Sequence, residues 1–356
     1  MYSTASGSSR RAKRGKLRLM CVDSICNLEQ NHQENPPNKY EFADIKDSCR
    51  IEYNGESIEF SIKQLINIKY LGQGCFGSVI LTQLEHRPDV IFACKRMTLE
   101  ILENNDYSSQ CDLRAMRDVG NDRHPHIVNF YAALIDLING ELVICMEALE
   151  TSMDKFYSTL HSRIQPSSNL LDLFIRRLAK HIVLALDYLK SKNLIHRDVK
   201  PQNMLVARPV IFKLCDFGIC ETYNDSLSLV LHRSMNYFSP ERFRGVYSYG
   251  IPSDMWALGM NLLEISQGYH PLASQPILSY LSHMNNGWQP DIPLTLNQHT
   301  RDLLSILLRH NVNERPRHYS DILSMPSMIS VEENPSDDEI NLVNCVLDAL
   351  PSETSE

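Results

Sequence analysis

The pattern of hydrophobic residues changes once along the chain, and this change constrains the fold more than any other feature. Between residues 51 and 149, short runs such as VIFACKRM and ELVICMEAL alternate with turns, which is typical of β-strands. A helical stretch is expected among them at about residues 98–118. After Leu149, the segment LLDLFIRRLAKHIVLALDYLK repeats apolar residues at the spacing of one helix face. The sequence therefore predicts an α+β protein with a small strand-rich part followed by a larger helical part.

Two further helices are expected in the second part. SDMWALGMNLLEISQG has Ser253 or Asp254 as its expected N-cap and Gly268 as its expected end. HTRDLLSILLRH is the other. With 356 residues, 43% of them hydrophobic, the chain is long enough for one large domain or two small ones.

Composition limits the setting of the protein. No run of eighteen apolar residues is present, so we expect no membrane span, and no apolar segment follows the basic N-terminus as in a secretory signal. Cys75, Cys94, Cys145 and Cys215 lie in apolar runs and are expected to be buried reduced thiols of a cytosolic protein.

The two ends differ in charge from each other. Residues 1–50 are rich in polar residues and are expected to form a disordered tail. The stretch SSRRAKRGKLRL within it has six basic residues and no acidic one, although the whole chain has a formal net charge of −8. The folded domain is expected at residues 60–327, and residues 328–356 are expected to be an acidic tail.

The glycine-rich segment LGQGCFGSV, residues 71–79, joins two strand-like runs. This context argues against a dinucleotide fingerprint, which joins a strand to a helix, and favours a flap over nucleotide phosphates. Lys95 follows in the apolar run FACKRM. On its own, that lysine could equally be an edge residue that faces water.

The segment LIHRDVKPQNML has the most specific chemistry in the chain. Asp198 can accept a hydroxyl proton, and Lys200 can reach a phosphoryl group that is being transferred. Asn203 can offer an amide oxygen to Mg²⁺, which prefers oxygen ligands. In KLCDFGI, Asp216 ends a strand at a turn where its carboxylate can bind metal.

In this order, the four motifs resemble the signature set of protein kinases. The resemblance implies a two-lobed kinase fold, with a small β-rich lobe containing one main helix and a larger helical lobe. It also implies ATP and Mg²⁺ as cofactors, Lys95 on the phosphates, Asn203 and Asp216 on the metal, and Asp198 with Lys200 as the catalytic pair. SPE (239–241) and ERPR extend it, and imply a structural ion pair between Glu241 and Arg315.

HPHIVNFYAAL, ELVICMEALETSMDKFY and FKLCDFGI resemble MAP kinase kinases, and CDLRAMRDV with TSMDKFY is similar to their stress-activated branch. This resemblance implies a dual-specificity enzyme that phosphorylates Ser/Thr and Tyr, and a gatekeeper at Met146. The residues implied to contact ATP are Leu71, Gly72, Gln73, Gly74, Cys75, Phe76, Gly77, Ser78, Val79, Ala93, Lys95, Met146, Glu147, Leu149 and Leu205.

The sequence departs from this family in three places. Asp112 stands where a Glu usually pairs with the lysine, so the helix must approach more closely for Asp112 to pair with Lys95. Ser226 matches the first activating phosphosite, but Val230 stands at the second, where Ser228 is an offset substitute. Arg233-Ser234-Met235-Asn236-Tyr237 replaces Gly-Cys-x-Pro-Tyr in the substrate loop, which bears on substrate recognition more than on chemistry.

The family also implies partners. The basic cluster and the apolar pair at its end resemble a MAP kinase docking motif, with residues Arg10, Arg11, Lys13, Arg14, Lys16, Leu17 and Leu19. Residues 328–356 are a candidate docking region for an upstream MAP kinase kinase kinase. We expect a cytoplasmic enzyme that is also found in the nucleus, with no membrane partner.

Two alternatives stay open on the sequence. The irregular activation segment would suit a pseudokinase or scaffold that binds a MAP kinase with little turnover. The basic tail would suit nucleic-acid binding, but the acidic body and the lack of interleaved aromatic residues disfavour it.

Overall fold

The computed structural model describes two compact units. The first comprises Met1–Glu103 and Phe130–Ala148, and the second Asn104–Asn129 and Leu149–Glu356. Backbone and side chains are described for residues 45–73, 77–98, 119, 123–216, 235–243, 250–272 and 282–351, and the backbone alone for 17–19, 74 and 221–222. The helix expected at about 98–118 lies almost entirely outside these residues. Among them, no helix is long and apolar enough to cross a membrane.

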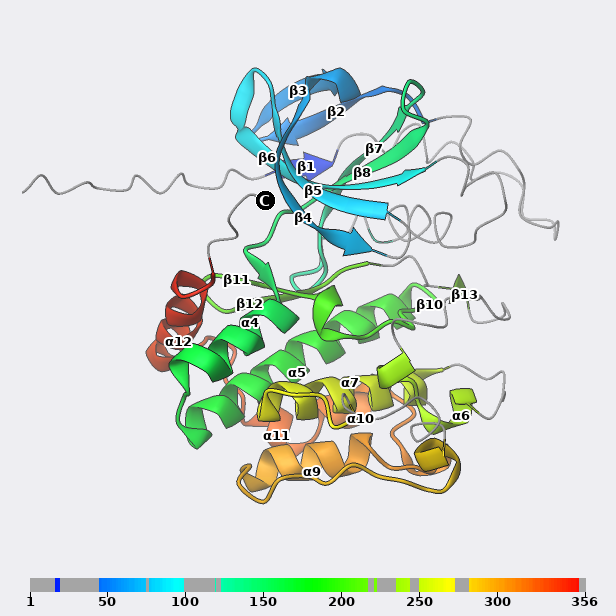
Figure 1. Ribbon diagram of the computed structural model, residues 1–356, viewed down its shortest axis with the longest axis vertical. Coiled ribbons are helices and arrows are strands. Elements are labelled where there is room, and N and C mark those ends of the chain that lie inside the picture. Colours follow the sequence, from blue (N-terminus) through cyan, green and yellow to red (C-terminus); the bar gives the residue numbers. More distant parts are fainter. Residues whose placement is uncertain are drawn as a thin grey trace, which may run out of the picture. The chain divides into compact units, whose positions relative to one another are not determined.

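The first unit contains a five-stranded antiparallel sheet with the strand order β4-β5-β6-β8-β7 (Figure 1). Its strands are β4 (Leu65–Gly74), β5 (Gly77–Leu84), β6 (Arg87–Thr98), β7 (Phe130–Asp136) and β8 (Glu141–Met146). The strand-rich first part predicted from the sequence is therefore confirmed. β4, β5 and β6 follow one another through short turns, as do β7 and β8, which antiparallel pairing permits. β7 follows β6 in sequence but is separated from it in the sheet by β8.

A second sheet of the first unit has the order β1-β2-β3. It consists of β1 (Leu17–Leu19), β2 (Ser48–Tyr53) and β3 (Glu56–Ser61), followed by the 3-10 turn η1 (Ile62–Gln64). β2 begins at Ser48, inside the range 1–50 for which disorder was expected. It forms a strand because its alternate residues Cys49, Ile51 and Tyr53 bury their side chains. This alternation is the pattern of a half-buried strand.

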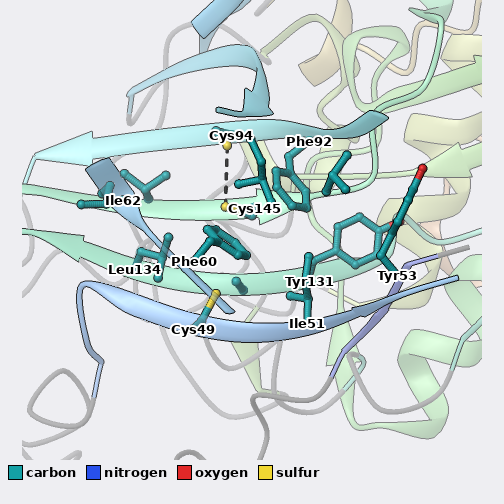
Figure 2. Close-up of a cluster of buried hydrophobic side chains, with 14 residues drawn as sticks. Cys49, Ile51, Tyr53, Phe60, Ile62, Phe92, Cys94, Tyr131, Leu134 and Cys145 are labelled. Atoms are coloured by element: carbon teal, nitrogen blue, oxygen red, sulfur yellow. Dashed lines mark hydrogen bonds between the residues drawn. The ribbon is translucent and has the colours of Figure 1, made fainter. Parts of the chain in front are cut away.

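The two sheets of the first unit share one hydrophobic core (Figure 2). Phe60 of β3 stacks on Phe92 of β6 with ring centroids 5.6 Å apart, and Tyr131 of β7 lies 6.0 Å from Phe92. Burying an aromatic side chain of this kind stabilises a fold by about 1.5–3 kcal/mol. The hairpin of β2 and β3 is therefore an integral layer of this unit.

The expected burial of the cysteines is met in part. Cys94 and Cys145 are fully buried on neighbouring strands, with their sulfur atoms 3.6 Å apart and no disulfide (Figure 2). Cys215 is a free thiol as well, but it is partly exposed because it follows the end of a strand. Cys75 lies outside the described residues.

Helices dominate the second unit (Figure 1). They are α4 (Met153–Thr159), α5 (Ser168–Ser191), α6 (Pro240–Phe243), α7 (Ile251–Gln267), α9 (Gln298–Leu307), α10 (Tyr319–Leu323), α11 (Pro326–Ile329) and α12 (Asp337–Asp348). The short strands are β9 (Thr151–Ser152), β10 (Leu194–Ile195), β11 (Met204–Ala207), β12 (Ile211–Leu214) and β13 (Glu221–Thr222). The other short elements are the π-helix η2 (Leu160–Ile164) and the 3-10 helices η3 (Pro201–Asn203), η4 (Met235–Tyr237) and η5 (Val312–Glu314). The three helices expected here are present as α5, α7 and α9.

The ends of α7 show which local signals were correctly interpreted. The helix ends at Gly268, whose φ of 84° is the left-handed conformation that glycine adopts without strain, as expected. Its start was predicted wrongly, because Gly250 is the N-cap and Pro252 lies in the first turn. Ser253 and Asp254 instead lie inside the helix, where tertiary hydrogen bonds use their side chains.

Helix α12 lies within the range expected to be an acidic tail. Ser336 accepts a hydrogen bond from the backbone N–H of Glu339, and Glu339 accepts one from the backbone N–H of Ser336, which together form a capping box. Glu339 also forms a buried ion pair with Arg177 of α5. Although burial opposes its charge, hydrogen bonds from Arg177 hold the pKa of Glu339 below its usual value. The acidic residues therefore start a packed helix rather than only a tail.

Candidate functional site

The glycine-rich segment forms the end of the β4–β5 hairpin, with Gly74 opposite Gly77 and Gly72 opposite Val79. A Cβ atom built on Gly77 would lie 1.8 Å from the backbone carbonyl oxygen of Arg96. No side chain fits there, so this glycine permits the close backbone approach of β5 to β6. A Cβ on Gly72 would meet nothing within 4 Å.

Four of the residues predicted to contact ATP share one face of the five-stranded sheet. Val79 lies opposite Lys95, and Ala93 lies opposite Met146 at the end of β8. Because alternate residues of a strand point to the same side, Ala93 and Lys95 of β6 share this face. Cys94, between them, points into the core of the first unit. Lys95 is only 4% exposed.

Asp198 is the centre of a hydrogen-bond cluster in the second unit. Lys200 Nζ donates to Asp198 Oδ2 at 2.6 Å, and Asn203 Nδ2 donates to the same oxygen at 2.9 Å. Asn203 Nδ2 also donates to the backbone carbonyl of Asp198 at 2.8 Å. Asp198 and Asn203 are buried, and Lys200 is nearly so. The amide nitrogen of Asn203 is thus occupied by Asp198, which turns its oxygen to the other side.

Several residues that the sequence did not single out support this loop. The backbone N–H of Asp198 donates to His196 Nδ1 at 3.3 Å, so His196 Nε2 is the donor to the carbonyl of Cys215 at 3.0 Å. Asn261 Nδ2 of α7 donates to the carbonyl of Val199 at 2.9 Å. His196 stands next to the motif, but nothing in the sequence near Asn261 marks it.

Asp254 of α7 supports the loop from another side. Its carboxylate, fully buried, accepts a hydrogen bond from the backbone N–H of Arg197 at 3.2 Å and one from the hydroxyl of Tyr319 at 3.3 Å. Arg197 has a φ of 65°, which non-glycine residues seldom adopt. Asp254 was expected only as a helix cap, and its contact with the loop was not predicted.

Asp216 follows β12 and Cys215, whose backbone N–H donates to the carbonyl of Asn203 at 2.9 Å. This hydrogen bond fastens the end of β12 to the loop that contains Asp198. Asp216 has a φ of 62°, so its backbone is left-handed, as is that of Arg197. Strained backbone of this kind is concentrated at functional sites.

The turn η4 belongs to the loop predicted to recognise substrate. The hydroxyl of Tyr237 donates to Glu264 of α7 at 2.8 Å, and the hydroxyl of Tyr157 of α4 donates to the same carboxylate at 2.6 Å. Burial raises the pKa of Glu264 and of both tyrosines. His270 Nε2 lies 3.1 Å from the carbonyl of Asn236. Tyr237 is therefore fixed, although this loop departs from the family pattern.

Glu241 and Arg315 lie together in the second unit, where they are 7% and 2% exposed. Arg315 donates to both carboxylate oxygens of Glu241, at 3.0 Å for the Nη1 bond, and also to the carbonyl of Pro252. Ser253 Oγ donates to Glu241 at 2.8 Å. Burial opposes the charge of Glu241, but the hydrogen bonds and charge of Arg315 hold its pKa below the usual value.

The other predicted residues are placed in part. Leu71 and Ser78 lie on β4 and β5, Glu147 and Leu149 follow β8 where the chain passes from the first unit to the second, and Leu205 lies on β11. Leu17 and Leu19 lie in β1. Other predicted residues lie outside the described residues, namely Arg10, Arg11, Lys13, Arg14, Lys16, Cys75, Phe76, Asp112, Ser226 and Ser228.

Comparison with known proteins assigns the family. Residues 65–327 match the protein kinase domain. The chain is 30% identical to the dual specificity mitogen-activated protein kinase kinase sek-1 of Caenorhabditis elegans, over 86% of this chain and 91% of the relative. It is 33% identical to the MAP kinase kinase mkk-4 of the same organism, over 60% of this chain and 57% of mkk-4. It is 31% identical to the protein kinase wis1 of Schizosaccharomyces pombe, over 78% of this chain and 46% of wis1.

The chain thus spans almost all of sek-1 but only about half of the other two relatives. The family match covers the glycine-rich hairpin, Lys95 and the Asp198 cluster alike. The chain is therefore a protein kinase and belongs to the MAP kinase kinases.

Proposed function

We propose that this kinase phosphorylates the Thr and Tyr of the activation loop of a stress-activated MAP kinase, with ATP as the phosphoryl donor. The observation that supports catalysis best is the cluster in which Asp198 accepts hydrogen bonds from Lys200 and Asn203. The likeness of CDLRAMRDV and TSMDKFY to the stress-activated branch supports the substrate class.

In this proposal Asp198 receives the proton of the substrate hydroxyl. Asn203 fixes the Asp198 carboxylate through its amide nitrogen, so the carboxylate is oriented before substrate arrives. Lys200 is close enough to Asp198 to place a positive charge beside the transferring phosphoryl group. This combination of positioning and charge stabilisation is the main source of rate in phosphoryl transfer.

The residues present fit a magnesium–nucleotide complex. The amide oxygen of Asn203 is turned away from Asp198, and Asp216 has its carboxylate at the turn after β12. These are the two hard oxygen ligands that we assign to Mg²⁺. When bound, Mg²⁺ neutralises charge on the phosphates. Lys95, on the same sheet face as Val79 and Ala93, would orient the phosphates, and the Gly72–Gly77 hairpin would exclude water.

Regulation by partners belongs to the same proposal. Ser226 is the proposed site of activation by an upstream MAP kinase kinase kinase, with Ser228 as the substitute second site. The docking motif that ends at Leu17 and Leu19 is proposed to bind the MAP kinase substrate. The location in the cytoplasm, and also in the nucleus, stays a prediction.

The test is phosphorylation of a panel of catalytically inactive MAP kinases by the purified chain, with phosphosites mapped on both proteins. We expect transfer to Thr and Tyr of one activation loop in a stress-activated member, and phosphate at Ser226 after treatment with an upstream kinase. Binding of these MAP kinases without transfer to any of them would contradict the proposal and favour the scaffold alternative.

A further inference from the structure

The segment Leu17–Leu19, which ends the predicted docking motif, forms strand β1 of the first unit (Figure 1). β1 pairs antiparallel with β2, so β2 is the central strand of its sheet and is not an edge. β1 also lies close to β7. An edge strand leaves a row of backbone N–H and C=O groups without partners, and a further extended segment can satisfy them. In this chain the docking segment takes that place.

The register of the pairing matches the sequence of the docking segment. Leu17 lies opposite Tyr53, and Leu19 lies opposite Ile51. Tyr53 and Ile51 are 3% and 0% exposed and belong to the core of the first unit. Leu17 and Leu19 therefore occupy the two register positions that are paired with buried residues of β2.

Arg18, between the two leucines, is also paired with a residue of matching character. Arg18 lies opposite Glu52, which is partly exposed. A basic residue is thus paired in register with an acidic one, and opposite charges at paired positions of two strands favour that register. A shift by one residue would pair the arginine with a buried position of β2 and a leucine with the partly exposed one. The spacing Leu-x-Leu therefore fits β2 as well as it fits a docking groove.

We propose that the side of β2 that pairs with β1 is an intramolecular binding site for the docking segment, and that it competes with the MAP kinase for that segment. This inference rests on the proposed docking function. The backbone of residues 17–19 cannot pair with β2 and lie in the groove of a partner at the same time. The segment that pairs with β2 is Leu17–Leu19 of the same chain, and both strands belong to the first unit.

The proposal implies an equilibrium between molecules whose docking segment is paired with β2 and molecules whose docking segment is free. A strand of three residues offers few hydrogen bonds, but the connecting chain keeps it close to β2, which raises its effective concentration. The apparent affinity for the MAP kinase is then reduced by the fraction of molecules whose segment is free. If one molecule in ten has a free segment, the affinity is about tenfold weaker than that of the isolated segment.

The first experiment locks the pairing with the double variant Arg18→Cys/Glu52→Cys in the full-length chain. Directly opposed residues of antiparallel strands have Cα atoms about 4.5–5.5 Å apart, within the range of a disulfide. Neither residue belongs to the docking leucines or to the catalytic cluster. Oxidised glutathione supplies the oxidant, and peptide mass mapping identifies the bond. The matched control is Arg18→Cys/Glu59→Cys, since Glu59 lies on β3, which does not pair with β1.

We expect an intramolecular disulfide between positions 18 and 52 and none between 18 and 59. The disulfide should lower phosphorylation of a full-length inactive MAP kinase at least about tenfold, since almost no free segment remains. Phosphorylation of a short peptide substrate should not change, and a reductant should restore the activity on the MAP kinase. In the opposite direction, Glu52→Arg places like charges in register and should tighten MAP kinase binding several-fold, whereas Glu59→Arg should not.

Three results would overturn the inference. Absence of the 18–52 disulfide, or a disulfide between two molecules, would show that β1 does not pair with β2 of its own chain. A disulfide that leaves MAP kinase phosphorylation unchanged would exclude competition. A synthetic peptide of residues 8–20 that binds no MAP kinase would overturn docking itself, and disulfide formation in the same variant would still distinguish that failure from a failure of the pairing.

Discussion

Lys200 Nζ lies 2.6 Å from Asp198 Oδ2, and this ion pair is buried beside Asn203. The pair places a cation and a proton acceptor side by side in a loop that is fixed by hydrogen bonds with Asp254 and Asn261 of α7 and with Cys215. This arrangement suits a reaction in which a hydroxyl loses its proton while negative charge moves through a phosphoryl group.

Asp198→Asn should remove the proton acceptor but keep the shape of the loop, because an amide can still accept from Lys200. We expect phosphoryl transfer to fall by about 10²–10⁴-fold, while ATP affinity changes little. A radiolabelled-phosphate assay and a nucleotide titration measure the two quantities. Asp187→Asn, an exposed site on the neighbouring helix α5, is the control. Retention of normal transfer by the Asp198 variant would exclude Asp198 as the base.

Gly77→Ala should disturb the nucleotide hairpin, because the new Cβ would lie 1.8 Å from the carbonyl oxygen of Arg96. The two strands must separate, and a displacement of about 1 Å near reacting groups can lower the rate about 10²-fold. Gly72→Ala is the matched control, since its Cβ would meet nothing within 4 Å. The measurement is kcat/KM for ATP, and equal values for the two variants would contradict the structural reason.

Tyr237→Phe and Tyr157→Phe each remove one hydrogen bond to the buried carboxylate of Glu264. Bonds to charged groups contribute about 1.5–3 kcal/mol, so both variants should lower the free energy of unfolding by similar amounts. Only Tyr237 belongs to the substrate loop. We therefore expect a raised KM for the MAP kinase in that variant alone, and an equal rise in both would assign the effect to stability.

Arg315→Ala should destabilise the second unit strongly, because it leaves the charge of Glu241 buried without its partner. Removing one member of a buried pair costs about 3–5 kcal/mol. The control is Arg50→Ala, which breaks the exposed pair with Glu59 and should cost at most about 1 kcal/mol. Urea denaturation measures both, and a similar small loss in the two variants would show that the Glu241 pair contributes little.

Stability should also depend on three histidines in the second unit. The rings of His126 and His181 stack with centroids 3.9 Å apart, and His124 lies edge-on to His126. Burial lowers the pKa of His126 to about 4 and that of His181 to about 3, and it lowers the pKa of His124 as well. The positive charges of Lys213, Arg177 and Lys180 act in the same direction.

The unfolded chain protonates these rings near pH 6.5, whereas the folded protein protonates His126 only near pH 4 and His181 only near pH 3. Between those values the unfolded state binds more protons, so the free energy of unfolding should fall as the pH is lowered. His181→Phe should reduce this dependence between pH 6.5 and 4, and His86→Phe, at an exposed site, should not. Denaturation curves at several pH values measure it. An unchanged slope in the His181 variant would show that another group controls it.

The sequence alone was sufficient where one local pattern specifies one structure. The apolar spacing of α5 and the glycine that ends α7 were correctly predicted, because each depends on residues within a few positions. The motif order also led to the kinase family, which the comparisons confirm.

Tertiary structure decided what the local patterns left open. Ser253 and Asp254 would suit a helix cap, but Glu241 and Arg197 use their side chains instead. Asn261 is an ordinary helix residue in sequence, and only the packing of α7 brings it to Val199. The polar segment that starts at Ser48 becomes a strand because the sheet of the same unit buries Ile51 and Tyr53. In each case the free energy comes from partners distant in the chain, and no local window of the sequence contains them.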